Sequence, residues 1–199
     1  MEYEMSKKIT DEQIRAIAKS YGIEFAALKA VTEVEAGDNG FLPDGKPKIL
    51  FEPHIFHRLL TEKNYITIRN RAKAENPKLC YLSWGAYPYG KESQQHNRLA
   101  IASKYDRDTA LESCSWGMGQ VMGYHWKKLG YASLQEFINA MYKDEAAQVD
   151  CMCRFIKVNG LIDELQRKDW AGFARGYNGS GFAKNQYDKK LAAAYRQFC

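Results

Sequence analysis

The chain has 199 residues, of which 45% are hydrophobic, and this is enough for one domain with a buried core. Its formal net charge of +5 is uneven, because residues 1–52 hold 7 Lys and Arg against 10 Asp and Glu, which leaves 22 against 14 for the remainder. Five cysteines without a CxxC pair argue against a secreted disulfide framework, and no apolar run approaches the roughly 20 residues that a membrane span requires.

Two helices are predicted at the start of the chain. Thr10 is a good N-cap residue, acids follow it, and Gly22 is a stop signal, so the first helix is expected between them. Apolar residues then recur at helical spacing from Ile23 to Val34, and Gly37 is expected to close this second helix.

A small hairpin and a mostly helical remainder follow. Asp44-Gly45 between two extended stretches is a strong turn signal and predicts two short strands within residues 40–52. The stretch 77–95 is rich in aromatic residues, Gly and Pro and is expected to be irregular. We therefore expect a mostly α fold with a small β-hairpin, an α+β class, in a single domain over 1–199. A small inserted helical and aromatic lobe near 61–113 is left open.

Five carboxylates lie between residues 30 and 52. Hydrolysis of a glycosidic bond needs one carboxyl group that keeps its proton and a second that stays ionised across a cleft. Glu35 lies beside apolar residues of its helix, where desolvation should raise its pKa, so it is the predicted acid. Glu33 lies one turn from Lys29, where an ion pair is expected instead.

Asp44, at the hairpin turn, and Glu52, at the end of the second strand, are the candidates for the second catalytic carboxylate. Each also has a simpler structural explanation. Asp is a common residue before Gly in a turn, and Glu52 could pair with Arg58 or cap the helix that begins at Pro53. The sequence leaves the choice between the two acids open.

Two further motifs contain candidate substrate-binding residues. In SWGMGQ, Ser115 and Gly117 belong to a predicted helix start where backbone can approach a ligand closely, and Gln120 supplies an amide for a sugar acetamido or hydroxyl group. Tyr177 and Asn178 precede a glycine-rich break and would place an aromatic ring and an amide at the mouth of a cleft. Tight helix packing and an ordinary helix C-terminus are the alternatives.

The aromatic stretch YLSWGAYPYG is a separate candidate for sugar binding. Trp84 and the tyrosines 81, 87 and 89 are residues that stack on sugar rings, and a locally packed aromatic loop is the alternative. His54 and His57 are three residues apart but have no third ligand in the sequence, so we expect no metal site and no cofactor.

The order of these motifs along the chain resembles that of a known protein family. Glu at the end of a helix in VEAG, followed by Ser-x-Gly-x-Gly-Gln and Tyr-Asn-Gly, resembles the lysozyme-like superfamily, as in goose-type lysozymes and soluble lytic transglycosylases. More closely, VEAGDNGFLPDGKPKILFEPHIFHRL with SWGMGQVMG resembles the N-acetylmuramidase domain of phage endolysins, from about residue 10 to the C-terminus. The resemblance implies a lysozyme-like fold that cleaves the β-1,4 bond between N-acetylmuramic acid and N-acetylglucosamine in peptidoglycan.

The resemblance also implies roles for particular residues. Glu35 would be the catalytic acid, and Gln120, Tyr177 and Asn178 would line the glycan cleft. The resemblance does not decide which hairpin acid is the second carboxylate. Asp44 stands at a spacing from Glu35 like that in small phage lysozymes, and Glu52 belongs to the family-like ILFEPHIF stretch. A lytic transglycosylase, which needs only one acid, and a non-catalytic peptidoglycan-binding virion protein are the alternative functions.

The remaining expectations concern partners and location. A basic surface suits a polyanionic partner such as peptidoglycan, and the lack of a zinc-finger or heptad signature argues against nucleic acid. We expect a monomer. The first residues, MEYEMSKKITDEQ, are charged throughout and do not resemble a signal peptide. The product is therefore expected in the host bacterial cytoplasm until a membrane pore such as a holin releases it to the wall.

Overall fold

The computed structural model describes residues 7–36 and 39–199, which are mostly helical with one small antiparallel sheet, as predicted. The helices are α2 (Asp11–Tyr21), α3 (Phe25–Ala36), α4 (Pro53–Glu62), α5 (Ile66–Glu75), α6 (Gln95–Ser103), α7 (Arg107–Glu112), α8 (Leu134–Lys143), α9 (Glu145–Val158), α10 (Ile162–Arg167), α11 (Trp170–Asn178) and α12 (Tyr187–Phe198). The strands are β1 (Ile49–Phe51), β2 (Cys114–Trp116) and β3 (Val121–Met122), and the 3-10 helices are η1 (Glu92–Gln94), η2 (Gly123–His125) and η3 (Ser180–Asn185). No helix in the described ranges has the length and apolar character needed to cross a membrane.

The first helices form where local sequence signals predict them. The Thr10 side chain accepts a hydrogen bond from the N–H of Gln13, and the Gln13 side chain accepts one from the N–H of Thr10. This capping box satisfies N–H groups at the start of α2, and Gly22 ends the helix with a φ of 66°. Helix α3 ends at Ala36, while Gly37, the predicted stop, lies outside the described residues.

The prediction of a local two-stranded hairpin is only partly right. Phe41 and Pro47 form a single antiparallel bridge around the turn at Asp44-Gly45. Strand β1, however, pairs with β2, which is distant in sequence, and β2 pairs in turn with β3. The segment with Gly117 and Gly119 is therefore a turn between two strands, and its prediction as a helix start was wrong. Neither partner strand carries a local signal for a pairing over this distance.

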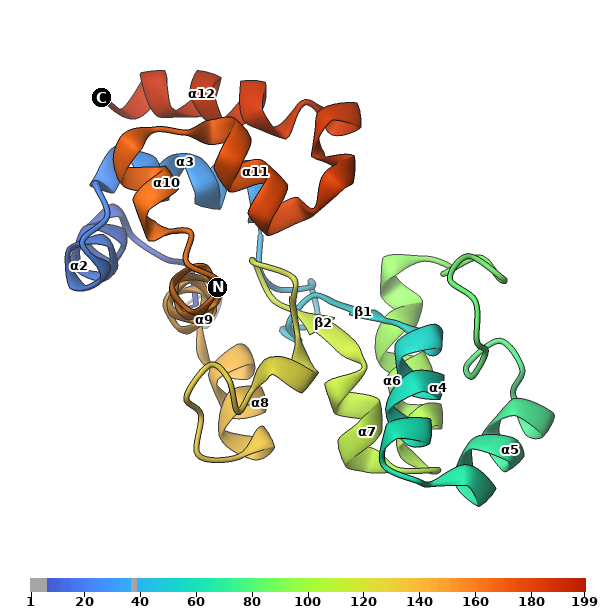
Figure 1. Ribbon diagram of the computed structural model, residues 1–199. Helices are drawn as coiled ribbons and strands as arrows, with labels where there is room; N and C mark the ends of the chain where they lie inside the picture. The colour runs from blue at the N-terminus through green and yellow to red at the C-terminus, as the bar shows by residue number, and fades with distance from the viewer. Residues whose placement is uncertain (1–6, 37–38) are drawn as a thin grey trace.

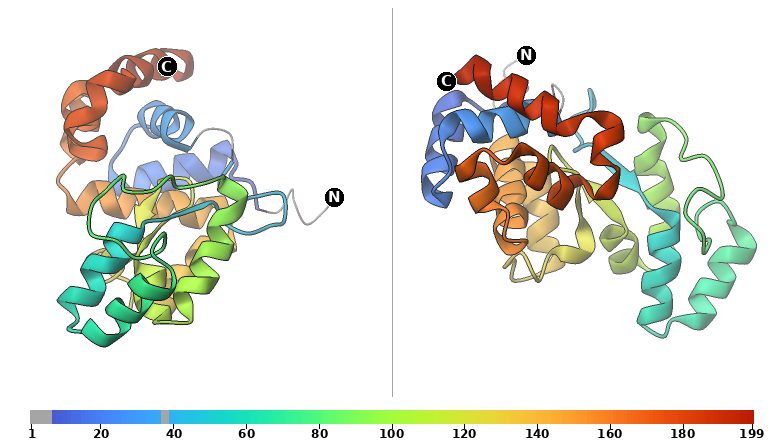
Figure 2. Two further views of the ribbon diagram at one scale, coloured as in Figure 1. Left: turned by 90° about the vertical axis from the view of Figure 1, so that its right-hand side faces the viewer. Right: turned by 45° about the horizontal axis from the view of Figure 1, so that its top comes forward.

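The hydrophobic core has two parts. One packs the helices α4 to α8 around the sheet, with Phe56 and Trp116 among its fully buried side chains, and the other packs α2, α3 and α9 to α12, with Leu28 and Phe173. Figure 1 shows the two resulting lobes, with α4 to α7 in one, α2, α3 and α10 to α12 in the other, and strands between them. Helix α12 lies along α3, as Figure 2 also shows.

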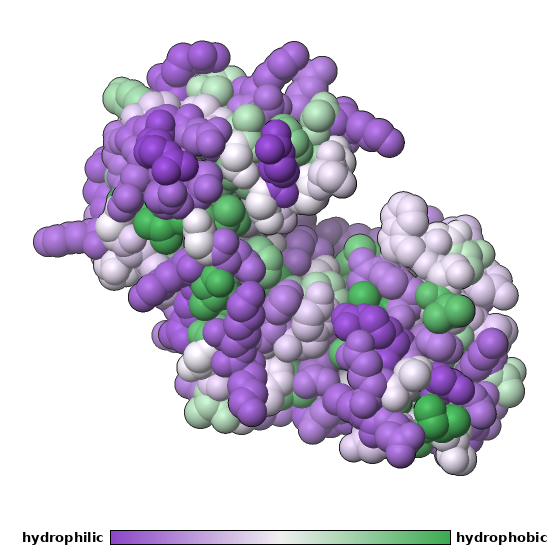
Figure 3. Space-filling model, viewed as in Figure 1, coloured by the Kyte–Doolittle hydropathy of each residue, from purple (hydrophilic) through white to green (hydrophobic). Residues whose placement is uncertain are grey.

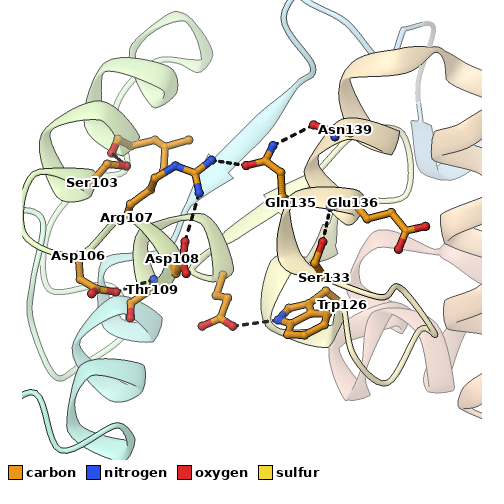
Figure 4. Close-up of polar contacts among 12 residues, drawn as sticks. Ser103, Asp106, Arg107, Asp108, Thr109, Trp126, Ser133, Gln135, Glu136 and Asn139 are labelled. Atoms are coloured by element: carbon orange, nitrogen blue, oxygen red, sulfur yellow. Dashed lines mark hydrogen bonds and ion pairs between the residues drawn. The ribbon is translucent and has the colours of Figure 1, made fainter.

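Polar contacts hold α7 against η2 and α8. The Arg107 guanidinium donates a hydrogen bond to the Gln135 side chain (Figure 4). On the next turn the indole N–H of Trp126 donates to the Glu112 carboxylate at 3.0 Å, and the same carboxylate pairs with Lys63 at 2.6 Å. These contacts fix the end of α4, α7 and the segment after β3 relative to one another.

Candidate active site

Glu35, in the last turn of α3, lies where two pockets adjoin. The first has a volume of about 410 Å³ and the second of about 350 Å³, and Glu35 and Gln120 line both. The first pocket is largely aromatic, with Tyr124, His125, Phe155, Tyr177 and Tyr187 in its lining. The second has charged and polar side chains in its lining, namely those of Lys48, Glu92 and Gln95, together with Gly90. The molecular surface is indented between the two lobes (Figure 3), and the two pockets together form a cleft that has Glu35 near its middle.

The Glu35 carboxyl group is placed to hold a proton. Its Oε2 accepts a hydrogen bond from Nδ2 of Asn178 at 2.9 Å, while its Oε1 is buried and has no hydrogen-bond partner in the described part of the chain. Burial raises the pKa of Glu35, and the Asn178 hydrogen bond and the charge of Lys190 oppose this rise. A carboxyl group with these properties is suited to donate a proton from Oε1 to a group that enters the cleft.

Glu33, two residues earlier, is in a different environment. Its side chain is exposed, and its carboxylate lies 3.2 Å from Nζ of Lys29, one helical turn away. The same lysine also lies 3.1 Å from the carboxylate of Asp11. The predicted ion pair is therefore confirmed, and the two neighbouring glutamates of α3 differ in burial and in partners.

The end of α11 brings Tyr177 and Asn178 to the acid. The Tyr177 hydroxyl donates a hydrogen bond to the carbonyl oxygen of Gly119 at 2.9 Å, and its ring stacks on Phe173 with 5.4 Å between centroids. Asn178 is the last residue of α11, and its Oδ1 is buried without a hydrogen-bond partner among the described residues. Both predicted residues line the first pocket together with Glu35, and Asn178 offers it an unused acceptor.

The turn between β2 and β3 lines both pockets, with Gly119 and Gln120 in the first and Gly117, Met118 and Gln120 in the second. Ser115 Oγ donates to Oε1 of Gln120 at 2.8 Å, and Nε2 of Gln120 donates to the carbonyl oxygen of Gly117 at 2.9 Å. The Gln120 amide is thus engaged within its own turn on both sides. Gly117 has a φ of 64°, and a Cβ there would lie 2.7 Å from the Gln148 side chain, so this position requires glycine for packing as well as conformation. Ser115 is buried and belongs to neither pocket lining as described.

Two buried polar residues of α9 hold the backbone around the cleft, and sequence analysis did not single them out. Gln148 accepts a hydrogen bond from the N–H of Met118 at 3.0 Å and donates to the carbonyl oxygens of Met141 and Gly40 at 2.8 and 3.3 Å. Glu145 accepts from the N–H of Gly40 at 3.1 Å. A polar residue within a helix carries no local signal of such long-range contacts, so only the folded structure reveals this role.

Asp44 is not brought to the cleft. It is exposed at the hairpin turn, its carboxylate lies 2.7 Å from Nζ of Lys46, and this contact lowers its pKa. Its environment is that of a turn residue, and it lines neither of the two pockets formed by the described residues.

Glu52 also lies outside the two described pocket linings. It accepts a short hydrogen bond from the hydroxyl of Tyr89, and its carboxylate lies 3.3 Å from Nδ1 of His54. Glu52 occupies the N-cap position of α4, as one structural explanation predicted, although its side chain makes no capping hydrogen bond. The predicted pair with Arg58 was wrong, because Arg58 pairs with Glu62 instead. In the described ranges, no three His, Cys, Asp or Glu side chains are grouped so that they could hold a metal ion.

Glu92 is a cleft residue that sequence analysis passed over. It belongs to η1, its side chain is 56% exposed, and its Oε1 lies 3.7 Å from Nζ of Lys48. Among the described residues that line either pocket, Glu35 and Glu92 are the only carboxylates. Glu92 stands in a stretch without regular periodicity, and it reaches the cleft through the tertiary placement of η1, which no local pattern indicates.

Comparison with known proteins agrees with this geometry. The Muramidase family, described as N-acetylmuramidase, matches residues 24–199. The crystal structure of the Burkholderia AP3 phage endolysin is similar to this chain, with a TM-score of 0.89 and 38% identity over 96% of this chain and 72% of that chain. No curated protein matches the chain. The chain therefore belongs to the N-acetylmuramidase family and is a glycoside hydrolase of the lysozyme type.

Proposed function

We propose that this peptidoglycan hydrolase cleaves the β-1,4 bond between N-acetylmuramic acid and N-acetylglucosamine, with Glu35 as the general acid. The observation that carries the proposal is Oε1 of Glu35, which is buried at the junction of two pockets and has no hydrogen-bond partner among the described residues. A glycan strand that occupies both pockets would bring a glycosidic oxygen to this atom, with a sugar on either side.

The chemical step follows from the hydrogen bond that Asn178 donates to Oε2. This contact leaves Oε1 as the oxygen that carries the proton of the neutral acid. Transfer of that proton to the glycosidic oxygen breaks its bond to the anomeric carbon, and positive charge develops on the sugar. A water molecule then attacks the anomeric carbon and gives its proton to a second carboxylate nearby, so a reducing end forms. Exchange with solvent returns both carboxyl groups to their starting protonation states.

We assign that second role to Glu92. The support is its position, since it shares the second pocket with Glu35 and is carried by η1, which directly precedes α6 of the other lobe (Figure 1). Its exposed side chain beside Lys48 differs from the buried setting of Glu35, as the two tasks require. Asp44 and Glu52 are less suitable, because neither lines one of the two described pockets.

The assignment of Glu35 is tested by Glu35→Gln. General acid catalysis contributes roughly 10²- to 10⁴-fold, so release of reducing ends from purified sacculi should fall by at least about 100-fold. Glu33→Gln, at an exposed position of the same helix, is the control and should keep full activity. Unchanged wall clearing by Glu35→Gln would indicate a non-catalytic role, and anhydromuramic ends in the products would identify a lytic transglycosylase instead.

The assignment of Glu92 is tested by Glu92→Ala with and without sodium azide. The variant should lose about 100-fold in kcat, while Asp44→Asn and Glu52→Gln should lose much less. Azide is an anionic nucleophile that needs no base, so it should restore turnover of Glu92→Ala and yield a glycosyl azide. Near-normal activity of Glu92→Ala without azide would remove Glu92 from the mechanism.

The similarity to a phage endolysin supports a role in host lysis. We propose that the enzyme remains in the host cytoplasm until a holin-type pore opens the membrane. Bacteria that express the chain alone should stay intact and should lyse within minutes once chloroform permeabilises their membrane. Spontaneous lysis without such treatment would argue against this route.

A further inference from the structure

The loop between α5 and η1 presents two large apolar side chains to solvent. Trp84 is 74% exposed and Leu82 is 73% exposed, the highest values for large hydrophobic residues in the described ranges. Figure 1 shows this loop beside the first turn of α6, and Figure 3 shows a pale, near-neutral surface over it. We refer to residues 81–90 as the aromatic loop.

The base of the aromatic loop is held firmly. The buried Gln95 donates hydrogen bonds to the carbonyl oxygens of Tyr89 and Lys91 at 2.9 and 3.1 Å and accepts one from the N–H of Phe51 at 3.2 Å. The Tyr89 hydroxyl donates to Glu52. These contacts tie the loop to β1 and to the start of α4, so its exposed residues stand on a fixed support.

The interior of the loop is packed as well. The rings of Tyr81 and Tyr87 lie 5.4 Å apart, and Tyr81 is buried. The two tyrosines therefore fill the space beneath the loop, whereas most of the Trp84 side chain stays in water and makes a polar contact with Tyr89. A fixed loop that leaves its largest apolar side chain in water is typical of a binding surface.

The position of the loop indicates what binds there. Gly90, in the loop, and Gln95, at its base, line the second pocket, so the loop continues the cleft on the side away from α3. An indole offers a flat apolar face, which suits the C–H face of an uncharged pyranose ring. A glycan strand that leaves the second pocket past Gly90 would run along the loop that carries Trp84.

We propose that the aromatic loop is an accessory glycan-binding surface, with Trp84 as the stacking residue for sugar units of peptidoglycan beyond the second pocket. The inference rests on the proposed function, because the occupant is the strand that Glu35 cleaves. It makes affinity depend on the length of the glycan strand, since a fragment confined to the two pockets would not contact Trp84.

The kinetic test compares intact sacculi with a purified tetrasaccharide from peptidoglycan. Trp84→Ala should raise KM for sacculi about tenfold, which corresponds to about 1.4 kcal/mol, with kcat unchanged. Its kcat/KM for the tetrasaccharide should stay within about twofold of the parent enzyme. Trp84→Phe, which keeps a flat ring, should restore most of the affinity. Tyr65→Ala, at another exposed aromatic residue of the same lobe, is the matched control and should change neither substrate.

A binding test separates this proposal from the catalytic one. Glu35→Gln should co-sediment with sacculi, and Glu35→Gln with Trp84→Ala should bind about tenfold more weakly. Because this readout needs no turnover, it decides the role of the loop even if Glu35 proves dispensable for catalysis. The proposal would be overturned if Trp84→Ala lowered kcat/KM equally on sacculi and on the tetrasaccharide, or left binding to sacculi unchanged. It would also be overturned if Trp84→Ala changed the elution volume in size-exclusion chromatography, because Trp84 would then serve self-association.

Discussion

Glu35 differs from its neighbour Glu33 although both occupy the same two turns of α3. Glu33 faces water and a lysine, whereas Glu35 faces Asn178 and the cleft, where one of its oxygens has no partner among the described residues. The helical offset of two residues is enough to turn one carboxyl group toward solvent and the other toward the interior. Burial then raises the pKa of Glu35 above that of an ordinary glutamate.

The alkaline limb of the pH profile should depend on the two groups that oppose this rise. Activity falls when Glu35 loses its proton, so the limb in kcat/KM reports the pKa of the acid in the free enzyme. Asn178→Ala removes a hydrogen bond that lowers this pKa, and Lys190→Met removes a positive charge that lowers it. Both variants should therefore move the limb to higher pH, and Asn178→Ala should also lower the plateau about tenfold, because the carboxyl group loses its orienting contact.

Initial rates on sacculi between pH 4 and 9 would check this expectation. Lys189→Met is a suitable control, since it removes a neighbouring charge of the same helix that does not figure in the environment of Glu35. A limb that stays in place in Asn178→Ala, or moves to lower pH, would mean that Glu35 is not the titrating group.

Sequence reasoning at this scale succeeded where a residue acts through its own helix. The setting of Glu35 and the Lys29–Glu33 pair both follow from positions within one helix, and Tyr177 and Asn178 mark the end of another. It passed over Glu92, whose relation to Glu35 depends on the packing of two lobes.

At the scale of elements, the β2–β3 turn and helix α9 act as a unit. Gln148 reaches from α9 to the turn at Met118 and to Gly40, which follows α3. The segments on both sides of the acid are thus joined through one buried side chain. The same dependence explains the errors in the predicted hairpin, because local turn chemistry located the bend at Asp44-Gly45 but could not specify which distant strand pairs with β1.

Gln148→Leu should destabilise the protein by about 3 kcal/mol, because it leaves a buried N–H and buried carbonyl oxygens without their partner. Urea unfolding monitored by circular dichroism would measure the loss. Gln197→Leu, at an exposed position of α12, is the matched control and should change stability by less than about 0.5 kcal/mol. Equal stabilities of the two variants would show that the Gln148 contacts contribute little.

At the scale of the whole molecule, the charge is divided unevenly along the chain. The first 52 residues carry an excess of acids, and the remaining residues carry 22 Lys and Arg against 14 Asp and Glu. A net positive charge increases the encounter rate with an anionic wall, and salt screens the attraction over about 8 Å at 0.15 M ionic strength. This expectation rests on composition alone, because net charge does not depend on the fold.

Binding of Glu35→Gln to sacculi should therefore weaken several-fold between roughly 0.05 and 0.3 M NaCl. Insoluble chitin, an uncharged polymer of N-acetylglucosamine, is the control and should bind with little dependence on salt. Co-sedimentation at each salt concentration would measure both. If binding to chitin weakened with salt to the same extent, electrostatic attraction would not explain the binding to sacculi.

The engaged amide of Gln120 has a consequence for specificity. Since this side chain already holds its own turn, acetamido groups in the cleft are expected to meet mainly the main chain of that turn. Peptide groups are the same whatever residue carries them, so the curvature of the turn would set which sugars fit. An engineer who wants to change the preferred wall chemistry should therefore graft a turn of different length rather than exchange single side chains.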